Sequence, residues 1–85
     1  MNSPQNLTNN VIMSYFNYHA VAINLIKTMH CKKAELKAKH NNISPALVLF
    51  FDNHKPMPIR KESFERYIPF LNFYEIPIIS NIDED

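Results

Sequence analysis

The chain of 85 residues contains no glycine. Glycine adopts a positive φ most readily and asparagine is the next most tolerant, so turns that need this conformation must use asparagine here. The chain has 11 asparagines, and we predict turns at Asn9-Asn10, Asn41-Asn42 and Asp52-Asn53. The absence of glycine also excludes the phosphate-binding P-loop, the Rossmann fingerprint and the nucleophile elbow.

Size and composition predict one small globular domain in the cytoplasm. A hydrophobic fraction of 46% suffices for a core. A domain of this size buries only about 60–65% of its unfolded surface, so its core is marginal and we expect a homodimer. A single cysteine, Cys31, excludes an internal disulfide, and the N-terminus lacks the features of a signal peptide. The uncharged stretch from Val11 to Ile26 is too short and too polar to cross a membrane, so we expect no membrane contact.

Hydrophobic periodicity divides the chain into a flexible N-terminus (residues 1–10), one domain (residues 11–80) and an acidic tail (residues 81–85). The first helix is expected from residue 11 onward. Apolar residues recur there on one helical face, at Val11, Tyr15, Tyr18, Ala22, Leu25, Ile26 and Met29. A short helix is expected over residues 62–68, where Pro69 ends or kinks it. Its buried face comprises Phe64, Tyr67, Ile68 and Leu71.

Residues 31–40 fit two structures. Their Lys, Ala, Glu and Leu content favours a helix, and none of them is β-branched or aromatic. However, Ala34, Leu36 and Ala38 also alternate with charged residues, as in a half-buried strand. We expect a helix here and keep the strand as the alternative.

The clearest strand runs from Ile43 to Phe51, because residues 46–51 are continuously apolar, which indicates that both faces of the strand are covered. After a turn at residues 52–55, the segment Pro56 to Ile59 returns as an edge strand, because proline cannot donate to a neighbour. Residues 76–79 are expected as a last edge strand or an extended arm. The fold class is therefore α+β, a small single domain with two or three helices packed on a two- or three-stranded antiparallel hairpin sheet. This inventory of parts resembles that of a winged helix.

Charge is unevenly distributed along the chain. Residues 1–26 carry none, residues 27–61 carry eight cations and two anions, and residues 62–85 carry one cation and six anions. A basic middle segment next to an exposed hairpin tip is typical of a surface that contacts phosphates. The predicted nucleic-acid-binding residues are Lys32, Lys33, Lys37, Lys39, His54, Lys55, Arg60 and Lys61.

We therefore expect a small DNA-binding accessory or regulatory protein of plasmid or phage type, with duplex DNA as its partner. Lysines contact the phosphate backbone and give affinity without reading the sequence. A lysine-rich solvated surface without function remains the alternative for the basic segment. For the prolines of the hairpin tip, the alternative is that they serve only to block edge-to-edge aggregation. A different function is that of a protein–protein adaptor or inhibitor that uses the hairpin edge, residues 76–79 and the acidic tail.

No catalytic, metal or cofactor site is expected. Cys31 beside His30 or near His40 imitates a thiol–imidazole pair, but no oxyanion hole accompanies it, and a small buried cysteine is the simpler interpretation. The histidines lack the spacing of a metal site. We interpret His19 as a core histidine bonded to a backbone carbonyl. We therefore expect neither an enzyme nor a small-molecule substrate.

Overall fold

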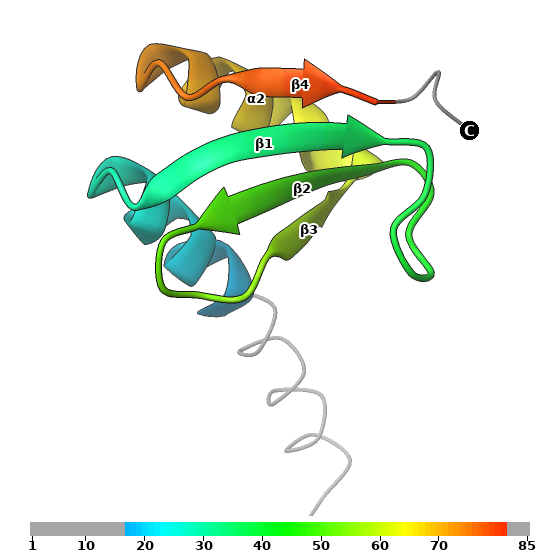
Figure 1. Ribbon diagram of the computed structural model, residues 1–85, viewed down its shortest axis with the longest axis horizontal. Coiled ribbons are helices and arrows are strands. Elements are labelled where there is room, and N and C mark those ends of the chain that lie inside the picture. The colour runs from blue at the N-terminus through cyan, green and yellow to red at the C-terminus, as the bar shows by residue number, and fades with distance from the viewer. Residues whose placement is uncertain (1–16, 82–85) are drawn as a thin grey trace, which may run out of the picture.

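The structure, a computed structural model, describes residues 17–81. In chain order the elements are an N-terminal helix (residues 17–27), β1 (Cys31–Lys37), β2 (Ala46–Phe51), β3 (Met57–Arg60), a 3-10 turn η1 (Lys61–Ser63), α2 (Phe64–Phe73) and β4 (Ile78–Ser80) (Figure 1). The turn expected at Asn9-Asn10 and the beginning of the first helix lie outside the described residues. Within residues 17–81 no helix is long and apolar enough to cross a bilayer.

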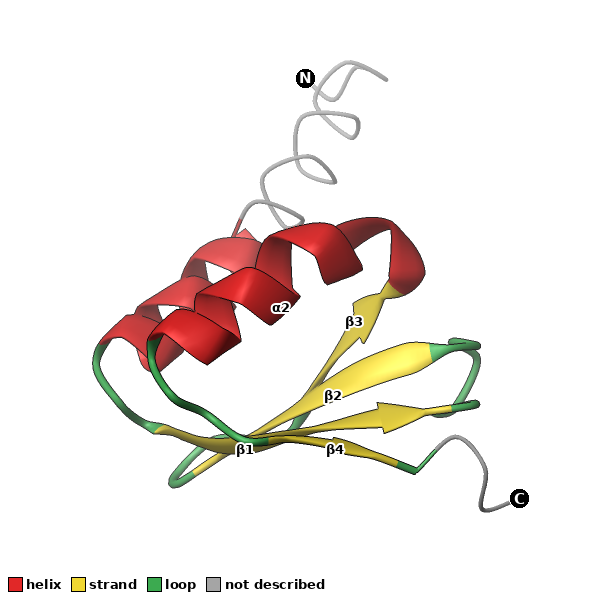
Figure 2. Ribbon diagram, turned by 90° about the horizontal axis from the view of Figure 1, so that it is seen from above, coloured by secondary structure: helices red, strands yellow, loops and turns green. Residues whose placement is uncertain are grey.

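The four strands form one mixed sheet in the order β3-β2-β1-β4. The β1–β2 and β2–β3 pairs are antiparallel, whereas β4 runs parallel to β1 because α2 carries the chain back across the sheet. Both helices of the described region pack on one face of this sheet (Figure 2). The α+β class is confirmed. The expected two- or three-stranded antiparallel sheet is only roughly right, and the hairpin β2–β3 is built into the sheet instead of standing out as a wing.

The helix expected over residues 31–40 is wrong, because residues 31–37 form strand β1. β1 lies between β2 and β4, and strand pairing on both sides outweighs the helical propensity of its residues. The alternation of side chains follows the strand interpretation: Ala34 is fully buried under the helices, whereas Glu35 lies on the opposite face. The register shifts between Cys31 and Lys33, which makes Lys32 the extra residue of a β-bulge.

Strand β2 is the centre of the core, as its continuous apolar run predicts. Leu47 and Leu49 face the helices, Ala46 and Val48 face the other side, and all four side chains are fully buried. β2 pairs with a neighbour on each side, which leaves it no free edge. The two helices complete the core with four fully buried residues, Ala22, Ile26, Tyr67 and Leu71.

The proline-containing return strand lies at the edge of the sheet, as predicted. Pro56 and Pro58 have no N–H to offer a further strand. The carbonyl of Pro58 accepts a hydrogen bond of 2.8 Å from the hydroxyl of Tyr18 on the N-terminal helix. The outer edge of β3 is therefore largely closed to another strand.

Both helices end in the same backbone motif. At the end of the N-terminal helix, Met29 has φ 63°, and the N–H of His30 donates to the carbonyl of Leu25. At the end of α2, Glu75 has φ 61°, and the N–H of Ile76 donates to the carbonyl five residues before it. These are Schellman caps, which normally place glycine at the residue with positive φ. Without glycine, the chain uses methionine and glutamate there.

The third positive φ among residues 17–81 belongs to Asn41, with φ 55°, in the turn predicted at Asn41-Asn42. In contrast, Pro69 does not end the second helix, because α2 continues from Phe64 to Phe73. Pro69 and Glu65, whose carbonyl would have received the missing hydrogen bond, are both exposed. Water can satisfy that carbonyl, so the proline is tolerated.

Candidate nucleic-acid interface

Both helices of the described region cover one face of the sheet, and the opposite face, which carries no helix within residues 17–81, is here called the open face (Figure 2). Lys33 and Lys37 are four residues apart in the strand, so both project to this side, with Glu35 between them. Lys32 is exposed at the bulge, and Lys39 is exposed just beyond the end of β1.

A carboxylate holds the two lysines of the open face. Nζ of Lys33 lies 2.8 Å from Oε2 of Glu35, and Nζ of Lys37 lies 3.8 Å from Oε1. Asn81 donates a third contact, from Nδ2 to Oε1 of Glu35 at 3.0 Å. The hydrogen bond from Lys33, helped by the charges of both lysines, lowers the pKa of Glu35 below its ordinary value despite partial desolvation. With two cations and one anion, the cluster keeps a net positive charge.

Phe50 lies beside this cluster on the open face of β2. Its ring is partly exposed, and Nζ of Lys33 and Nζ of Lys37 lie 5.1 Å and 5.9 Å from the ring centroid. These distances place both ammonium groups within cation–π range of one ring. The aromatic face and the two charges therefore form a single surface feature.

Arg60 extends the positive charge toward the edge strand. It is paired with Ala46, which is paired with Lys37, so the three residues form one row across the sheet. Arg60 is exposed, and its charge partly opposes the rise that burial causes in the pKa of Tyr18. Lys61 follows in η1 and is also exposed.

The hairpin tip lies at the opposite end of the strands. His54 and Lys55 are exposed there, and the ring of His54 contacts its neighbour through Nδ1 and the carbonyl of Lys55 at 2.8 Å. The N–H of Asp52 donates to the carbonyl of His30, and Oδ2 of Asp52 lies 3.8 Å from Nδ1 of His30. A strand of six residues such as β2 spans roughly 20 Å. The eight predicted residues are therefore divided between two ends of the sheet.

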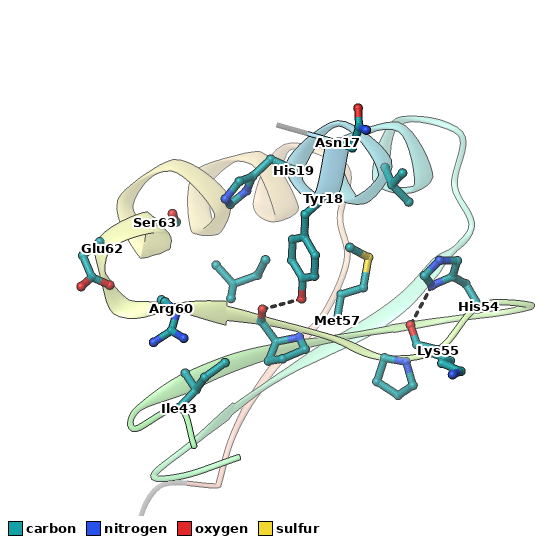
Figure 3. A pocket seen from close by; sticks show the side chains of 14 residues that line it. Asn17, Tyr18, His19, Ile43, His54, Lys55, Met57, Arg60, Glu62 and Ser63 are labelled. Atoms are coloured by element: carbon teal, nitrogen blue, oxygen red, sulfur yellow. Dashed lines mark hydrogen bonds between the residues drawn. The ribbon is translucent and has the colours of Figure 1, made fainter. Parts of the chain in front are cut away.

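An open groove of about 1100 Å³ runs between the N-terminal helix and β3 (Figure 3). Lys55 and Arg60 line it at the two ends of the strand, and the hydrogen bond from Tyr18 to Pro58 crosses it. Its lining between these cations is largely apolar, as at Met57.

Two titratable side chains, Cys31 and His19, lie in or beside the core. Burial raises the pKa of Cys31 to about 11, so its thiol is protonated at neutral pH. Nδ1 of His19 lies 2.6 Å from the hydroxyl oxygen of Tyr67, a side-chain contact that the sequence did not predict. Among residues 17–81, no three His, Cys, Asp or Glu side chains are grouped to hold a metal ion.

The site predicted from the sequence did not include three residues that lie with Lys33 and Lys37 on the open face, namely Glu35, Phe50 and Asn81. The alternating segment 33–37 carried a signal for Glu35, because a strand places this residue between two lysines.

Comparison of the chain with known protein families, with curated proteins and with solved structures finds no match.

Proposed function

We propose that this protein binds nucleic acid through the open face of its sheet, as a small DNA-binding accessory or regulatory protein. The observation that carries the proposal is a difference in net charge between the sheet and the helices that cover it. Sheet strands and their turns, residues 30–60 and 77–81, carry six cations and two anions, a net charge of +4. The helical segments, residues 17–29 and 61–76, carry three of each and are neutral.

Phosphate contacts from Lys33 and Lys37 are the core of this proposal. Their side chains are 42% and 34% exposed, so the ammonium groups are accessible while the stems rest near Phe50. A phosphate approaching this face meets the same two charges that now contact Glu35. Arg60 at the edge and the hairpin tip with His54 supply further contacts. Such contacts provide affinity and a strong dependence on salt.

The test is a titration of labelled duplex and single-stranded DNA of about 20 nucleotides, followed by fluorescence anisotropy between about 50 and 200 mM salt. The double variant Lys33→Gln, Lys37→Gln is expected to bind more weakly and to reduce the slope of log affinity against log salt by about 1 per lysine. The matched control is Lys27→Gln, Arg66→Gln, which removes the same charge from the helical segments at residues outside the predicted binding set. Absence of binding at low salt, or an equal loss in both variants, would refute the proposal.

A second candidate function, protein–protein contact, is favoured by the outer edge of β4, which pairs with no strand among residues 17–81. The N–H of Ala34 donates to the carbonyl of Pro77, and the N–H of Asn81 donates to the carbonyl of Leu36. Alternate residues of a strand face the same neighbour, so the backbone groups of Ile78 and Ser80 point away from β1. Nearby, Ile79 is 42% exposed and Phe73 is 76% exposed.

This edge suits a second copy of the chain. Since the prolines block β3, β4 is the one open edge of the sheet among residues 17–81, and two such edges pair to give a closed dimer. Sedimentation velocity over a range of concentrations tests the idea. The variant Ile79→Lys should abolish any dimer, whereas Lys33→Gln, Lys37→Gln should leave it intact. A wild-type chain that is monomeric at all concentrations excludes this candidate.

A further inference from the structure

We infer that the nucleic acid bound on the open face is single-stranded and that Phe50 is the platform on which one base stacks. The inference rests on the proposed function, since it names the form of nucleic acid that the same site would accept.

The position of Phe50 is the first argument. It lies on β2, an inner strand of the sheet, and its partly exposed ring has two ammonium groups within 6 Å of the centroid. An aromatic ring on a sheet surface stacks with any base, since every base has a π face. Lys33 and Lys37 next to the ring are placed for the phosphates on either side of a stacked nucleotide. The bases of a duplex are paired and stacked on each other, and they offer no free face to such a ring.

The composition of the open face is the second argument. One row of paired residues crosses it from Pro58 through Val48 and Glu35 to Ile79. The apolar residues at its two ends are accessible, since Pro58 is partly exposed and Ile79 is 42% exposed, whereas Val48 is buried beneath the surface. A surface that contacts only phosphates gains nothing from apolar side chains. Splayed bases, in contrast, bury apolar area against them.

The shape of the sheet is the third argument. Four strands at a spacing of 4.7–4.9 Å span roughly 14 Å, which is wider than the major groove of about 12 Å. The sheet therefore cannot enter the groove as a helix or a two-stranded ribbon does. Among residues 17–81 the helices are narrow enough to enter, and their segments are electrically neutral.

The test compares Phe50→Leu with Phe73→Leu in the titration described above. Both remove an aromatic ring and keep an apolar side chain, but Phe73 lies at the end of α2 and is 76% exposed. We expect Phe50→Leu to weaken binding of single-stranded DNA by about 5- to 100-fold and to change duplex binding by less than about twofold. Phe73→Leu should change neither, and Phe50→Tyr, which retains a stacking ring, should restore the affinity.

The outcomes separate the two proposals. If the duplex binds at least as tightly as the single strand at equal salt, or if Phe50→Leu leaves single-strand binding unchanged, the inference fails. The proposed function then still stands, provided that Lys33→Gln, Lys37→Gln weakens binding. If neither form of DNA binds at low salt, both fail. Circular dichroism and urea unfolding of each variant check that a loss of binding does not reflect a loss of folding.

Discussion

The hydroxyl of Tyr18 donates a hydrogen bond of 2.8 Å to the carbonyl of Pro58, although 40 positions separate the two residues in sequence. This contact fastens the N-terminal helix to the edge strand β3. It also occupies a carbonyl that would otherwise face outward on an edge whose prolines donate nothing. The N-terminal helix thus helps to prevent a further strand from pairing with the outer edge of β3.

Removing the Tyr18 hydroxyl should destabilise the protein modestly. Tyr18→Phe keeps the ring and loses the hydrogen bond, so we expect the free energy of unfolding to fall by about 0.5–1 kcal/mol. Urea unfolding monitored by circular dichroism measures the change. Tyr74→Phe is the control, because the Tyr74 hydroxyl makes no hydrogen bond among the described residues. Equal effects of the two substitutions would contradict a role for the Tyr18 contact.

Stability should depend on pH through His19. Burial, with a smaller contribution from the charge of Arg66, lowers the pKa of His19 below 6.5 in the folded state. The unfolded chain therefore binds the proton more tightly, and the stabilising contribution is fully present above pH 6.5. It is lost as the pH falls from there through the folded-state pKa. Urea unfolding between about pH 5 and 8 should show this decline.

Two variants separate His19 from other titrating groups. His19→Gln should flatten the decline. Arg66→Gln should make it smaller, because removing this positive charge brings the folded-state pKa of His19 closer to 6.5. A decline of unchanged steepness in His19→Gln would assign it to another residue.

The fold was predictable where burial alone determines structure. Residues 46–51 are apolar without interruption, and this pattern requires a strand covered on both faces. The strand at residues 31–37 was not predictable, because the lysines and alanines of this segment favour a helix until β2 and β4 are known to lie beside it. The parallel direction of β4 likewise depends on the path of α2 across the sheet.

The candidate site was only partly predictable for a similar reason. The lysines are visible as a charged segment, whereas the contact between Glu35 and Asn81 joins residues 46 positions apart. Likewise, Phe50 looks like any core aromatic in a run of apolar residues. Only the register between β1 and β2 shows that it shares the open face with Lys33.

Glycine at the two helix ends should stabilise the protein. Met29 and Glu75 adopt a positive φ, which costs about 1 kcal/mol for a residue with a side chain. Both are exposed, so Met29→Gly and Glu75→Gly lose little packing. Each should raise the free energy of unfolding by about 0.5–1 kcal/mol. Asn41→Gly is the control, since asparagine tolerates this conformation and a smaller gain is expected there. A loss of stability in Glu75→Gly would show that the glutamate side chain has a role of its own.

Neutralising Glu35 should strengthen nucleic-acid binding and weaken the fold. Glu35→Gln releases Lys33 and Lys37 from their carboxylate, so we expect affinity for DNA at low salt to rise several-fold. Because the pKa of Glu35 is lowered in the folded state, its stabilising contribution exists above pH 4.5 and is lost as the pH falls through the folded-state pKa. The acid limb of an unfolding-versus-pH curve should therefore be shallower in Glu35→Gln. Unchanged or weaker DNA binding in this variant would indicate that the cluster is not the binding surface.

The acidic residues at the end of the chain should compete with nucleic acid for the open face. Asp83, Glu84 and Asp85 follow shortly after Asn81, which contacts Glu35 within the cluster. Three negative charges tethered so near the lysines raise the local concentration of a competing anion. The triple variant Asp83→Asn, Glu84→Gln, Asp85→Asn keeps the length of the chain and should bind DNA several-fold more tightly at about 50 mM salt. The gain should vanish near 1 M salt, because charges are then screened within about 3 Å. The same triple substitution in the Lys33→Gln, Lys37→Gln background is the control. A gain of equal size there would mean that the tail acts through the net charge of the whole protein and not through the two lysines of the open face.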